Sequence, residues 1–364
     1  MDHPVARRTL LAGLAAAPVA ALAIPGQANA TGATSTAERL TEAFTAYGNS
    51  GRGWTGADST YSVRLPGDRQ LWLFSDTFLG TVDPDGSRPA DSPIVNNTFV
   101  VQRGRTMTTI HGGTAAEPAA ILSPDQADSW YWLGGAYLGA GALNVMFLRF
   151  ERFGPGMWDW AWKENVLARF DVATLTVKSL HPMPSGANVQ WASWLQRIGG
   201  HTYVHGVEDL GLTKHMHVAR VAGDDLRRPW QYFTGDGWST SEQDSARVMA
   251  GVGNEYSVTP WRDRWLLVTQ DTNTLFSNEI VGYTAPTPTG PFGDRRLLHT
   301  MPESGLFGSY GDPDVITYNA HEHPELRRDD KVVITYNVNS LTFTDVLEDV
   351  TKYRPRFVEV QLAP

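Results

Sequence analysis

The sequence of 364 residues contains no cysteine, so we expect neither disulfides nor thiolate metal sites nor a lipoprotein anchor. It also has no dense run of lysine or arginine, and its formal net charge is −9. A nucleic-acid partner is therefore not expected, because phosphate binding needs clustered basic side chains. After the N-terminal segment no stretch is apolar enough to span a bilayer, so we also expect no membrane anchor.

Motifs of several common enzyme classes are missing as well. The sequence has no G-x-S-x-G elbow, no Walker loop and no dinucleotide-binding fingerprint, which disfavours serine-hydrolase and nucleotide chemistry. Glycine (35), proline (22) and tryptophan (13) are frequent, and this composition favours strands and turns over helices. The best helix candidate is residues 36–48, with Thr36 as its N-cap and Gly48 just past its end.

The first 30 residues have the features of a cleaved export signal. Arg7 and Arg8 precede an apolar run, which ends in the small-x-small cleavage pattern Ala28-Asn29-Ala30. The paired arginines resemble those of a twin-arginine signal, and an ordinary secretory signal is the alternative. Either signal predicts a protein that is secreted to the extracellular space or the cell wall.

One strand–turn–strand pattern recurs five times along the chain. The copies span residues 57–78, 128–151, 188–209, 254–271 and 310–340. Their spacing is typical of propeller blades of about four strands, and further strands fit between them. We therefore predict an all-β fold, a five-bladed β-propeller with acidic residues at the mouth of a central channel. A double β-sandwich is the alternative.

The predicted layout has three parts. A signal (residues 1–30) precedes a short segment with the helix (31–50), and a single propeller domain follows (51–364). The C-terminal strand, residues 356–362, would complete the ring by pairing with strands near the N-terminus. We expect the protein to be a monomer.

Acidic residues occupy both ends of the first hairpin. Asp58 opens its first strand and Asp76 closes its second, so the two carboxyls should lie at the same edge of an antiparallel sheet. Further acids begin or end strands of other hairpins: Glu255, Asp312, Asp314, Glu208, Asp209 and Asp271. Crowded like charges raise one another's pKa and do not stabilise a fold, which indicates a functional site. The alternative is that Asp58 and Asp76 are ordinary turn and edge residues.

Several segments between residues 50 and 340 carry a family resemblance. They are "GADSTYSV", "LWLFSDTFLG", "NNTFVVQ", "NEYSVTPW", "LLVTQD" and "YGDPDVITY". These segments resemble secreted actinobacterial β-propellers, long catalogued as domains of unknown function, which include the endo-D-arabinanases of glycoside hydrolase family 183. In that family two aspartates of the first hairpin form the catalytic pair, and they match Asp58 and Asp76. The resemblance implies hydrolysis of a furanosidic, arabinan-like polysaccharide.

The remaining candidates are residues that would bind a sugar chain. They are Glu255, Asp312, Asp271, Glu208, His205, Trp130, Trp158 and Trp191. The acids and the histidine would hydrogen-bond to sugar hydroxyls, and the tryptophans would stack on sugar rings because aromatic faces supply a large, rigid contact area. Packing in the core is the alternative for the tryptophans, and a turn is the alternative for Asp312.

The segment "HEHPE" contains residue types that bind metals. Its His321, Glu322, His323 and Glu325 fall in the long turn of the fifth hairpin, which we expect to be remote from the acidic mouth. A zinc site needs three or four converging ligands, and the sequence offers no partner cluster. We therefore predict no metal site here and no required cofactor, while a channel-bound cation such as calcium is compatible with the acidic mouth.

Together these features predict a secreted glycoside hydrolase that cleaves a polysaccharide with paired aspartates. One carboxyl would donate a proton to the leaving oxygen, and the other would attack the anomeric carbon or activate water. The alternative is a propeller without turnover that binds carbohydrate or belongs to the cell wall.

The export signal gives a first testable prediction. Replacing both Arg7 and Arg8 with lysine should block secretion, because the twin-arginine route requires the arginine pair. The measurement is the amount of protein in the medium relative to the cell. Unchanged export of the double-lysine variant would show that an ordinary secretory signal is used instead.

Overall fold

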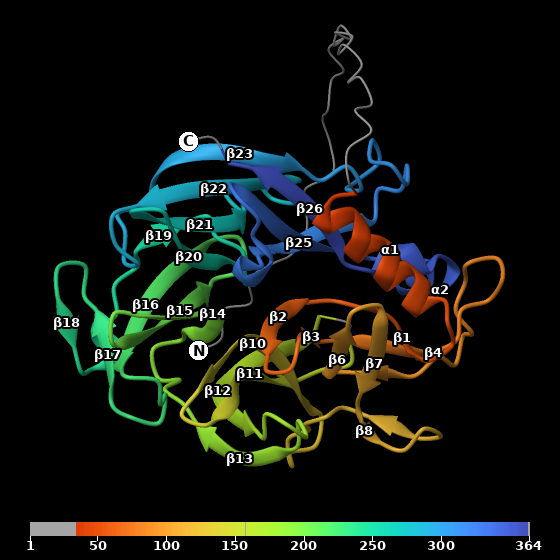
Figure 1. Cartoon of the computed structure of the whole chain (residues 1–364), viewed down its shortest axis with the longest axis horizontal. Coiled ribbons are helices and arrows are strands. Elements are labelled where there is room, and N and C mark those ends of the chain that lie inside the picture. The colour runs from red at the N-terminus through yellow and green to blue at the C-terminus, as the bar shows by residue number, and fades with distance from the viewer. Residues whose placement is uncertain (1–33, 157, 363–364) are drawn as a thin grey trace, which may run out of the picture. The chain divides into compact units, whose positions relative to one another are not determined.

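Almost all regular structure in this chain is β-strand. The computed structural model describes residues 34–156 and 158–362, so the predicted signal at residues 1–30 lies outside the described residues (Figure 1). The helices are α1 (Thr36–Gly48), α2 (Phe343–Glu348) and the short 3-10 helices η1 (Glu242–Asp244), η2 (Pro324–Leu326) and η3 (Val350–Tyr353). The prediction of an all-β fold is confirmed.

Five antiparallel sheets follow one another along the chain (Figure 1). Sheet 1 contains β2 (Tyr61–Leu65), β3 (Arg69–Phe74), β6 (Thr98–Arg103) and β7 (Thr106–Ile110). Sheet 2 contains β10 (Ser129–Gly139), β11 (Ala142–Arg152), β12 (Trp160–Phe170) and β13 (Val177–Pro182). Sheet 3 contains β14 (Gln190–Ile198), β15 (His201–Asp209), β16 (Lys214–Ala222), β17 (Trp230–Phe233), β18 (Trp238–Ser239) and β19 (Met249–Ala250).

Sheet 4 contains β20 (Ser257–Trp261), β21 (Arg264–Gln270), β22 (Glu279–Ala285) and β23 (Gly293–Thr300). Sheet 5 contains β24 (Val315–Glu322), β25 (Lys331–Ser340) and β26 (Arg356–Gln361). Two smaller sheets pair β1 (Gly53–Ala57) with β4 (Thr77–Gly80) and β5 (Ile94–Val95), and β8 (Gly112–Gly113) with β9 (Pro118–Ala119). The first two strands of each of the five sheets form the five hairpins that the sequence predicts.

The C-terminal strand does not pair as predicted. β26 pairs with β25 in sheet 5, in a register that runs from Lys331 opposite Gln361 to Tyr336 opposite Arg356. The expected pairing with strands near the N-terminus is therefore wrong. Because the backbone groups of a strand need partners, β26 satisfies the free edge of β25, and the N-terminal helix α1 covers β26 instead. The Thr36 backbone N–H donates to the Glu359 carboxylate at 3.0 Å.

Side-chain hydrogen bonds join each sheet to the next. The Leu133 N–H donates to Ser75 Oγ between sheets 1 and 2, and the Trp191 N–H donates to Asn165 Oδ1 between sheets 2 and 3. The other three junctions are Ser193 Oγ to Asn254 O, Thr259 Oγ1 to Glu322 Oε2, and Thr60 Oγ1 to Asn337 Oδ1. The last of these joins sheet 5 back to sheet 1.

The helix α1 occupies the range that the sequence predicts. Its N-cap is Ser35 rather than Thr36, and the Ser35 hydroxyl and the Glu38 carboxylate each accept the other residue's backbone N–H, which is a capping box. Phe44 packs on Trp72 at a ring distance of 5.3 Å, so the helix is part of the core. The unit formed by the sheets accordingly starts at Ser35, whereas the sequence prediction started the domain at residue 51. Among the described residues, no helix combines the length and apolarity needed to cross a bilayer.

A buried arginine holds the segment that carries α2 and η3 against β1. The Arg88 guanidinium donates to Thr55 Oγ1 and Thr55 O, and also to the carbonyls of Val346 and Val350. These hydrogen bonds give the buried backbone carbonyls of Thr55, Val346 and Val350 a donor, and buried polar groups need such partners. They fix Tyr353, at the end of η3, next to the strand that leads into Asp58.

Gly56 in β1 gives a prediction about this packing. A Cβ at this position would clash with the Tyr353 carbonyl and the Arg88 guanidinium, whereas a Cβ at Gly293 would meet nothing within 4 Å. Gly56→Ala should therefore lower the unfolding free energy by about 1–3 kcal/mol, the usual range for overpacking. Gly293→Ala should change it by less than about 0.5 kcal/mol. Thermal melts of both variants check this, and equal melting temperatures would contradict the packing described.

Candidate active site

Asp58 and Asp76 lie side by side because the backbone pairs them directly. The Asp58 N–H donates to Asp76 O, and the Ser75 N–H donates to Asp58 O, both at 3.2 Å. Between β1 and β2 the chain turns through Ser59 and Thr60, whose φ angles are +68° and +66°. Non-glycine residues rarely adopt this left-handed conformation, and strained backbone of this kind tends to cluster at functional sites.

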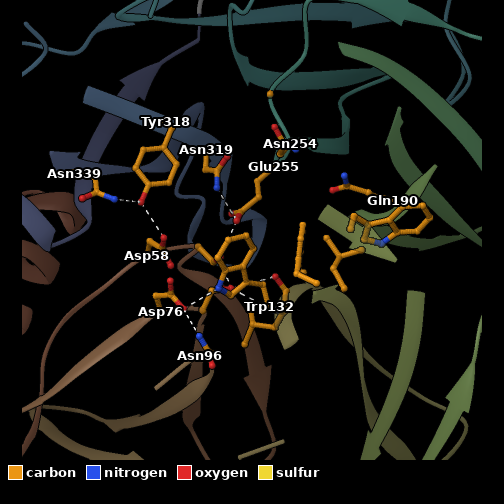
Figure 2. A pocket seen from close by; sticks show the side chains of 18 of the residues that line it. Asp58, Asp76, Asn96, Trp132, Gln190, Asn254, Glu255, Tyr318, Asn319 and Asn339 are labelled. Carbon is orange, nitrogen blue, oxygen red and sulfur yellow. Dashed lines mark hydrogen bonds between the residues drawn. The ribbon is translucent and has the colours of Figure 1, made fainter. Parts of the chain in front are cut away.

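Each aspartate is held by neutral donors, and the two side chains point toward each other (Figure 2). Tyr318 Oη donates to Asp58 Oδ2 at 2.8 Å, while Asp58 Oδ1 is buried without a partner among the described residues. Asp76 Oδ1 accepts from Asn96 Nδ2 at 2.9 Å and from Trp132 Nε1 at 2.8 Å. Neither hydrogen-bond set includes a cation, so neither carboxylate has a positive charge to stabilise it.

Burial and proximity change the acidity of the pair. Burial, and secondly the charge of Asp76, raise the pKa of Asp58 to about 7, against the opposing hydrogen bonds from Tyr318 and Tyr353. Burial also raises the pKa of Asp76, and the hydrogen bonds from Asn96 and Trp132 oppose that rise. The two carboxyls therefore titrate as a pair and share protons near neutral pH.

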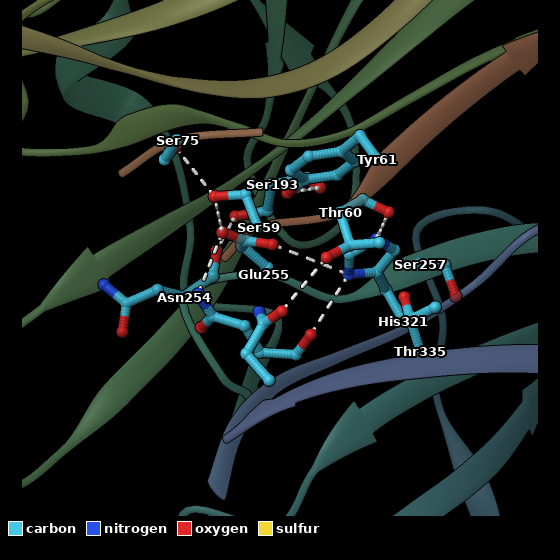
Figure 3. A network of polar contacts seen from close by, with 12 residues as sticks. Ser59, Thr60, Tyr61, Ser75, Ser193, Asn254, Glu255, Ser257, His321 and Thr335 are labelled. Atoms are coloured by element: carbon cyan, nitrogen blue, oxygen red, sulfur yellow. Dashed lines mark hydrogen bonds and ion pairs between the residues drawn. The ribbon is translucent and has the colours of Figure 1, made fainter. Parts of the chain in front are cut away.

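A third acid, Glu255, belongs to the same polar network (Figure 3). Its Oε1 lies 2.7 Å from the Ser59 hydroxyl and 2.8 Å from Asn319 Nδ2, and its Oε2 is buried without a hydrogen bond among the described residues. Burial raises the pKa of Glu255 well above its usual range, and the charge of Asp58 adds to this. The expectation that Glu255 lies at the acidic mouth agrees with this position.

The "HEHPE" segment is not the remote turn that the sequence suggests. His321 and Glu322 end the buried strand β24, and His321 Nδ1 lies 3.6 Å from Glu255 Oε2. Burial lowers the pKa of His321 to about 4. Glu322 is fully buried and its carboxylate accepts from the Arg327 guanidinium at 2.7 Å, so this segment supports the floor of the site.

The three acids open into a cavity of about 910 Å³. One wall carries aromatic side chains from sheet 2, and the facing wall carries polar groups from sheets 3 and 4. The aromatic residues that line it are Trp130, Trp132, Phe150, Trp160 and Trp162 of sheet 2 and Trp158 of the loop between β11 and β12. The polar residues of the facing wall include Gln190, Asp209, Lys214 and Asn254. A cavity of this size holds a small molecule or several sugar units.

Three of the predicted acids lie elsewhere, each paired with a basic side chain. The pairs are Glu208–Arg247 (2.6 Å), Asp271–Arg295 (2.7 Å) and Asp312–Lys352 (2.6 Å). Hydrogen bonds from these partners lower the pKa of Glu208 and Asp312. None of the three lines the cavity, contrary to the expectation of one crowded acidic mouth. Their charges are neutralised by cations outside the hairpin, namely Arg247 in the loop before β19, Arg295 in β23 and Lys352 in η3, which a pattern within one hairpin cannot reveal.

The other two predicted residues outside the cavity belong to the core. Trp191 is fully buried, and its Nε1 donates to Glu242 Oε1 at 2.8 Å. His205 is also fully buried, and its Nε2 lies 3.0 Å from the Pro288 carbonyl oxygen. Burial lowers the pKa of His205 to about 4. Both side chains stabilise sheet packing and do not reach the cavity, whereas Trp130 and Trp158 do.

One group of acids has the spacing of a cation site. Asp312, Asp314 and Asp345 have oxygen atoms within 4.8 Å of one another. The Lys352 ammonium lies 2.6 Å from Asp312 and 3.8 Å from Asp345, so a protein cation already neutralises the cluster. The cluster is outside the cavity, so it gives no support to a channel-bound cation such as calcium, which the sequence analysis left open.

Several residues of the site were not among the predicted ones. Asn96, Tyr318 and Asn339 provide the hydrogen bonds around the two aspartates. A signal for Asn96 does exist, because the paired asparagines of "NNTFVVQ" stand directly before an apolar strand. Tyr318 offers no such signal, since it precedes the bulge in β24 that interrupts the register with β25.

The chain belongs to a family described as a domain of unknown function, DUF5005, which matches residues 41–362. No curated protein matches the sequence. Among solved structures, a Bacteroides ovatus protein described as a "putative hydrolase" is similar over 88% of each chain, with a TM-score of 0.74 and 20% identity. This likeness shows that the two proteins share a fold.

Two further solved structures are similar at lower TM-scores. One is a GH32 β-fructofuranosidase of Bombyx mori, with a TM-score of 0.48, 12% identity, and coverage of 90% of this chain and 67% of that one. The other is an α-L-arabinofuranosidase of Podospora anserina, with a TM-score of 0.46, 10% identity, and coverage of 87% and 93%.

The raised pKa of Asp58 predicts a pH-dependent stability. Between about pH 4 and pH 7 native Asp58 keeps a proton that the unfolded chain has lost, so wild-type stability should fall as pH rises through this window. Asp58→Asn removes this fall in stability, because asparagine does not ionise. The melting temperature of the variant, relative to wild type, should therefore rise between about pH 4 and pH 8.

The matched control for this measurement is Asp68→Asn. Asp68 is an exposed acid in the β2–β3 turn of the same hairpin, so its substitution should shift the melting temperature equally at both pH values. If the difference in melting temperature between Asp58→Asn and wild type is also the same at both pH values, the raised pKa of Asp58 is contradicted.

Proposed function

We propose that this protein is a secreted glycoside hydrolase that cleaves a polysaccharide with Asp58 and Asp76 as its catalytic carboxyls. The observation that carries the proposal is the meeting of these two carboxyls, both with raised pKa, in a cavity of about 910 Å³. Glycosidases of most families need two carboxyls that flank one bond, one of them protonated. An acid pair without a neutralising cation is costly for stability, which favours a chemical role.

The hydrogen bonds suggest how the two roles divide. Asp58 has a pKa near 7 and an oxygen without a partner, so it can keep a proton and donate it to the leaving glycosidic oxygen. Asp76 has one oxygen fixed by two N–H donors, which favours its ionised form. Ionised Asp76 would attack the anomeric carbon or activate a water molecule.

The proposed substrate is a furanosidic polymer such as arabinan. This rests on the resemblance of the first hairpin to the endo-D-arabinanases of glycoside hydrolase family 183, whose catalytic aspartates match Asp58 and Asp76. The amide side chains around the acids fit a hydroxyl-rich ligand, because each amide both donates and accepts. They are Asn96, Gln190, Asn254, Asn319 and Asn339.

The proposed architecture is a five-bladed β-propeller, with the five sheets as blades. It is supported by the hydrogen bonds that join each sheet to the next and sheet 5 back to sheet 1. In such a ring the first strands of the blades surround the site, and the acids of sheets 1 and 4 converge there. Export through the twin-arginine signal and action as a monomer without a required cofactor complete the proposal.

The rival function is carbohydrate binding without turnover, and the aromatic wall of the cavity favours it equally. Aromatic faces and amides suffice to bind a sugar. A binding module has no need for two adjacent acids with raised pKa, so the acid pair decides between the two functions by experiment.

Asp58→Asn and Asp76→Asn should each reduce turnover on the polymer by on the order of 10²–10⁴-fold, the usual contribution of a proton-transfer group. The measurement is the release of reducing sugar from arabinan, arabinogalactan and other furanosides, with a thermal melt for each variant. Asp68→Asn, in the exposed turn of the same hairpin, should keep wild-type turnover. Turnover by both site variants at the wild-type rate, with the fold intact, would remove the pair from the chemistry.

A further inference from the structure

One wall of the cavity is built almost wholly from aromatic side chains of sheet 2. Trp130 and Trp132 come from β10, Phe150 from β11, and Trp160 and Trp162 from β12. Trp132 and Trp160 pack edge to face with centroids 5.2 Å apart, and Trp132 and Phe150 pack in a tilted arrangement with centroids 4.5 Å apart. This packing makes the wall rigid, and a rigid aromatic surface loses little entropy when it binds a ligand.

The wall continues out of the cavity onto the surface. Trp158, in the loop between β11 and β12, is 60% exposed, and its ring centroid lies 6.4 Å from that of Trp160. A tryptophan that served only the core would be covered, as Trp191 is in sheet 3. The exposed ring extends an aromatic surface that begins next to the acids.

The wall is directly connected to the acid pair. The Trp132 indole N–H donates to Asp76 Oδ1 at 2.8 Å while its ring packs on Phe150 and Trp160. A ligand that lies along the rings must therefore pass beside Asp76. The side chain of Trp132 thus connects the Asp76 carboxylate to the aromatic wall, and a shift of either would move the other.

The chemistry of the wall selects for neutral, hydroxylated ligands. Of the described residues that sheet 2 contributes to the cavity, none is acidic, and the one basic residue, Arg152, donates to Gly156 O at 2.8 Å. The indole nitrogens of Trp130 and Trp162 are buried and have no hydrogen-bond partner among the described residues, so these two side chains offer the cavity their ring surfaces rather than their N–H groups. Aromatic faces suit a ring that has C–H groups on its faces.

The facing wall has a different character. Lys214 Nζ lies 3.5 Å from Asp209 Oδ2 and donates to Asn254 Oδ1, so its charge is already paired. Asn254 Nδ2 also donates to Asp209 Oδ2 at 2.7 Å. Since these groups satisfy one another, the aromatic wall offers the larger surface that is free to bind.

We infer that the aromatic wall is an extended subsite that binds several sugar units of a neutral polysaccharide on one side of the acid pair. This inference rests on the proposed function and specifies its substrate as a long, uncharged chain. Each ring that stacks on the wall adds binding energy, so affinity increases with chain length until the chain reaches Trp158.

The test measures binding by calorimetry in the full chain that carries Asp58→Asn, so that the ligand is not consumed. The probes are size-graded oligosaccharides from arabinan, with a xylan series as a second arm. Affinity should rise with length, and adding Trp158→Ala should weaken binding of the long oligosaccharides by about threefold to tenfold, the range for one aromatic contact. Binding of a disaccharide should not change, because it does not reach Trp158.

Two further variants separate stacking from general damage. Trp158→Phe should restore part of the lost affinity, because it keeps an aromatic face. Phe307→Ala removes another exposed aromatic ring, 99% exposed and outside the cavity, and should leave binding at every length unchanged.

The outcomes distinguish the subsite from the proposed function. If Trp158→Ala binds every length as tightly as its parent, the subsite is overturned, while loss of hydrolysis in Asp58→Asn still supports the enzyme. If no oligosaccharide of either series binds, the subsite is overturned, and a parallel hydrolysis assay on the wild-type chain decides the function independently. Length-dependent affinity that Trp158→Ala weakens and Trp158→Phe partly restores supports the subsite.

Discussion

The backbone pairing of Asp58 with Asp76 is the constraint on which the site depends. Two main-chain hydrogen bonds of 3.2 Å join the ends of neighbouring strands. The backbone therefore places the two carboxyls close together, independently of the side-chain contacts of either residue. The pairing requires the left-handed turn at Ser59 and Thr60, and such strain costs about 1–3 kcal/mol per residue. The contacts of these residues offset that cost, because the Ser59 hydroxyl lies 2.7 Å from Glu255 and the Thr60 hydroxyl donates to Asn337. The strained turn thus ties sheet 1 to sheets 4 and 5.

This constraint has an electrostatic consequence. Three carboxyls share one region, and the hydrogen bonds to Asp58, Asp76 and Glu255 come from hydroxyl, amide and indole groups. Neutral donors orient a carboxyl without supplying the charge that would keep it ionised. Burial therefore dominates, and the pKa of each of the three carboxyls lies above its usual range.

The sequence predicts the local features well and the distant contacts poorly. Alternating apolar residues and turn chemistry locate all five hairpins, and the helix α1 occupies the predicted range. The acids Asp58 and Asp76 follow from the geometry of one hairpin. The interpretation of Glu208, Asp271 and Asp312 is wrong because their cationic partners come from distant parts of the chain. The interpretation of Trp191 is wrong because burial against a neighbouring sheet leaves no trace in a local pattern. The buried environment of His321 was missed for the same reason, since it depends on contacts between sheets.

The separation of the acids from the aromatic wall has a consequence for how such a protein diversifies. The acids sit at strand ends in sheet 1, whereas the loop with Trp158 joins two strands of sheet 2, and Trp132 is the hydrogen-bonded link between them. If the proposed function holds, exchanging the loop that carries Trp158 for one of another length would alter which sugar chains bind, and it would leave the strained turn beside the acid pair in place. Substrate choice could then change through the loop of sheet 2 while the chemistry at the acid pair stays the same, and the indole of Trp132 marks the boundary between the two.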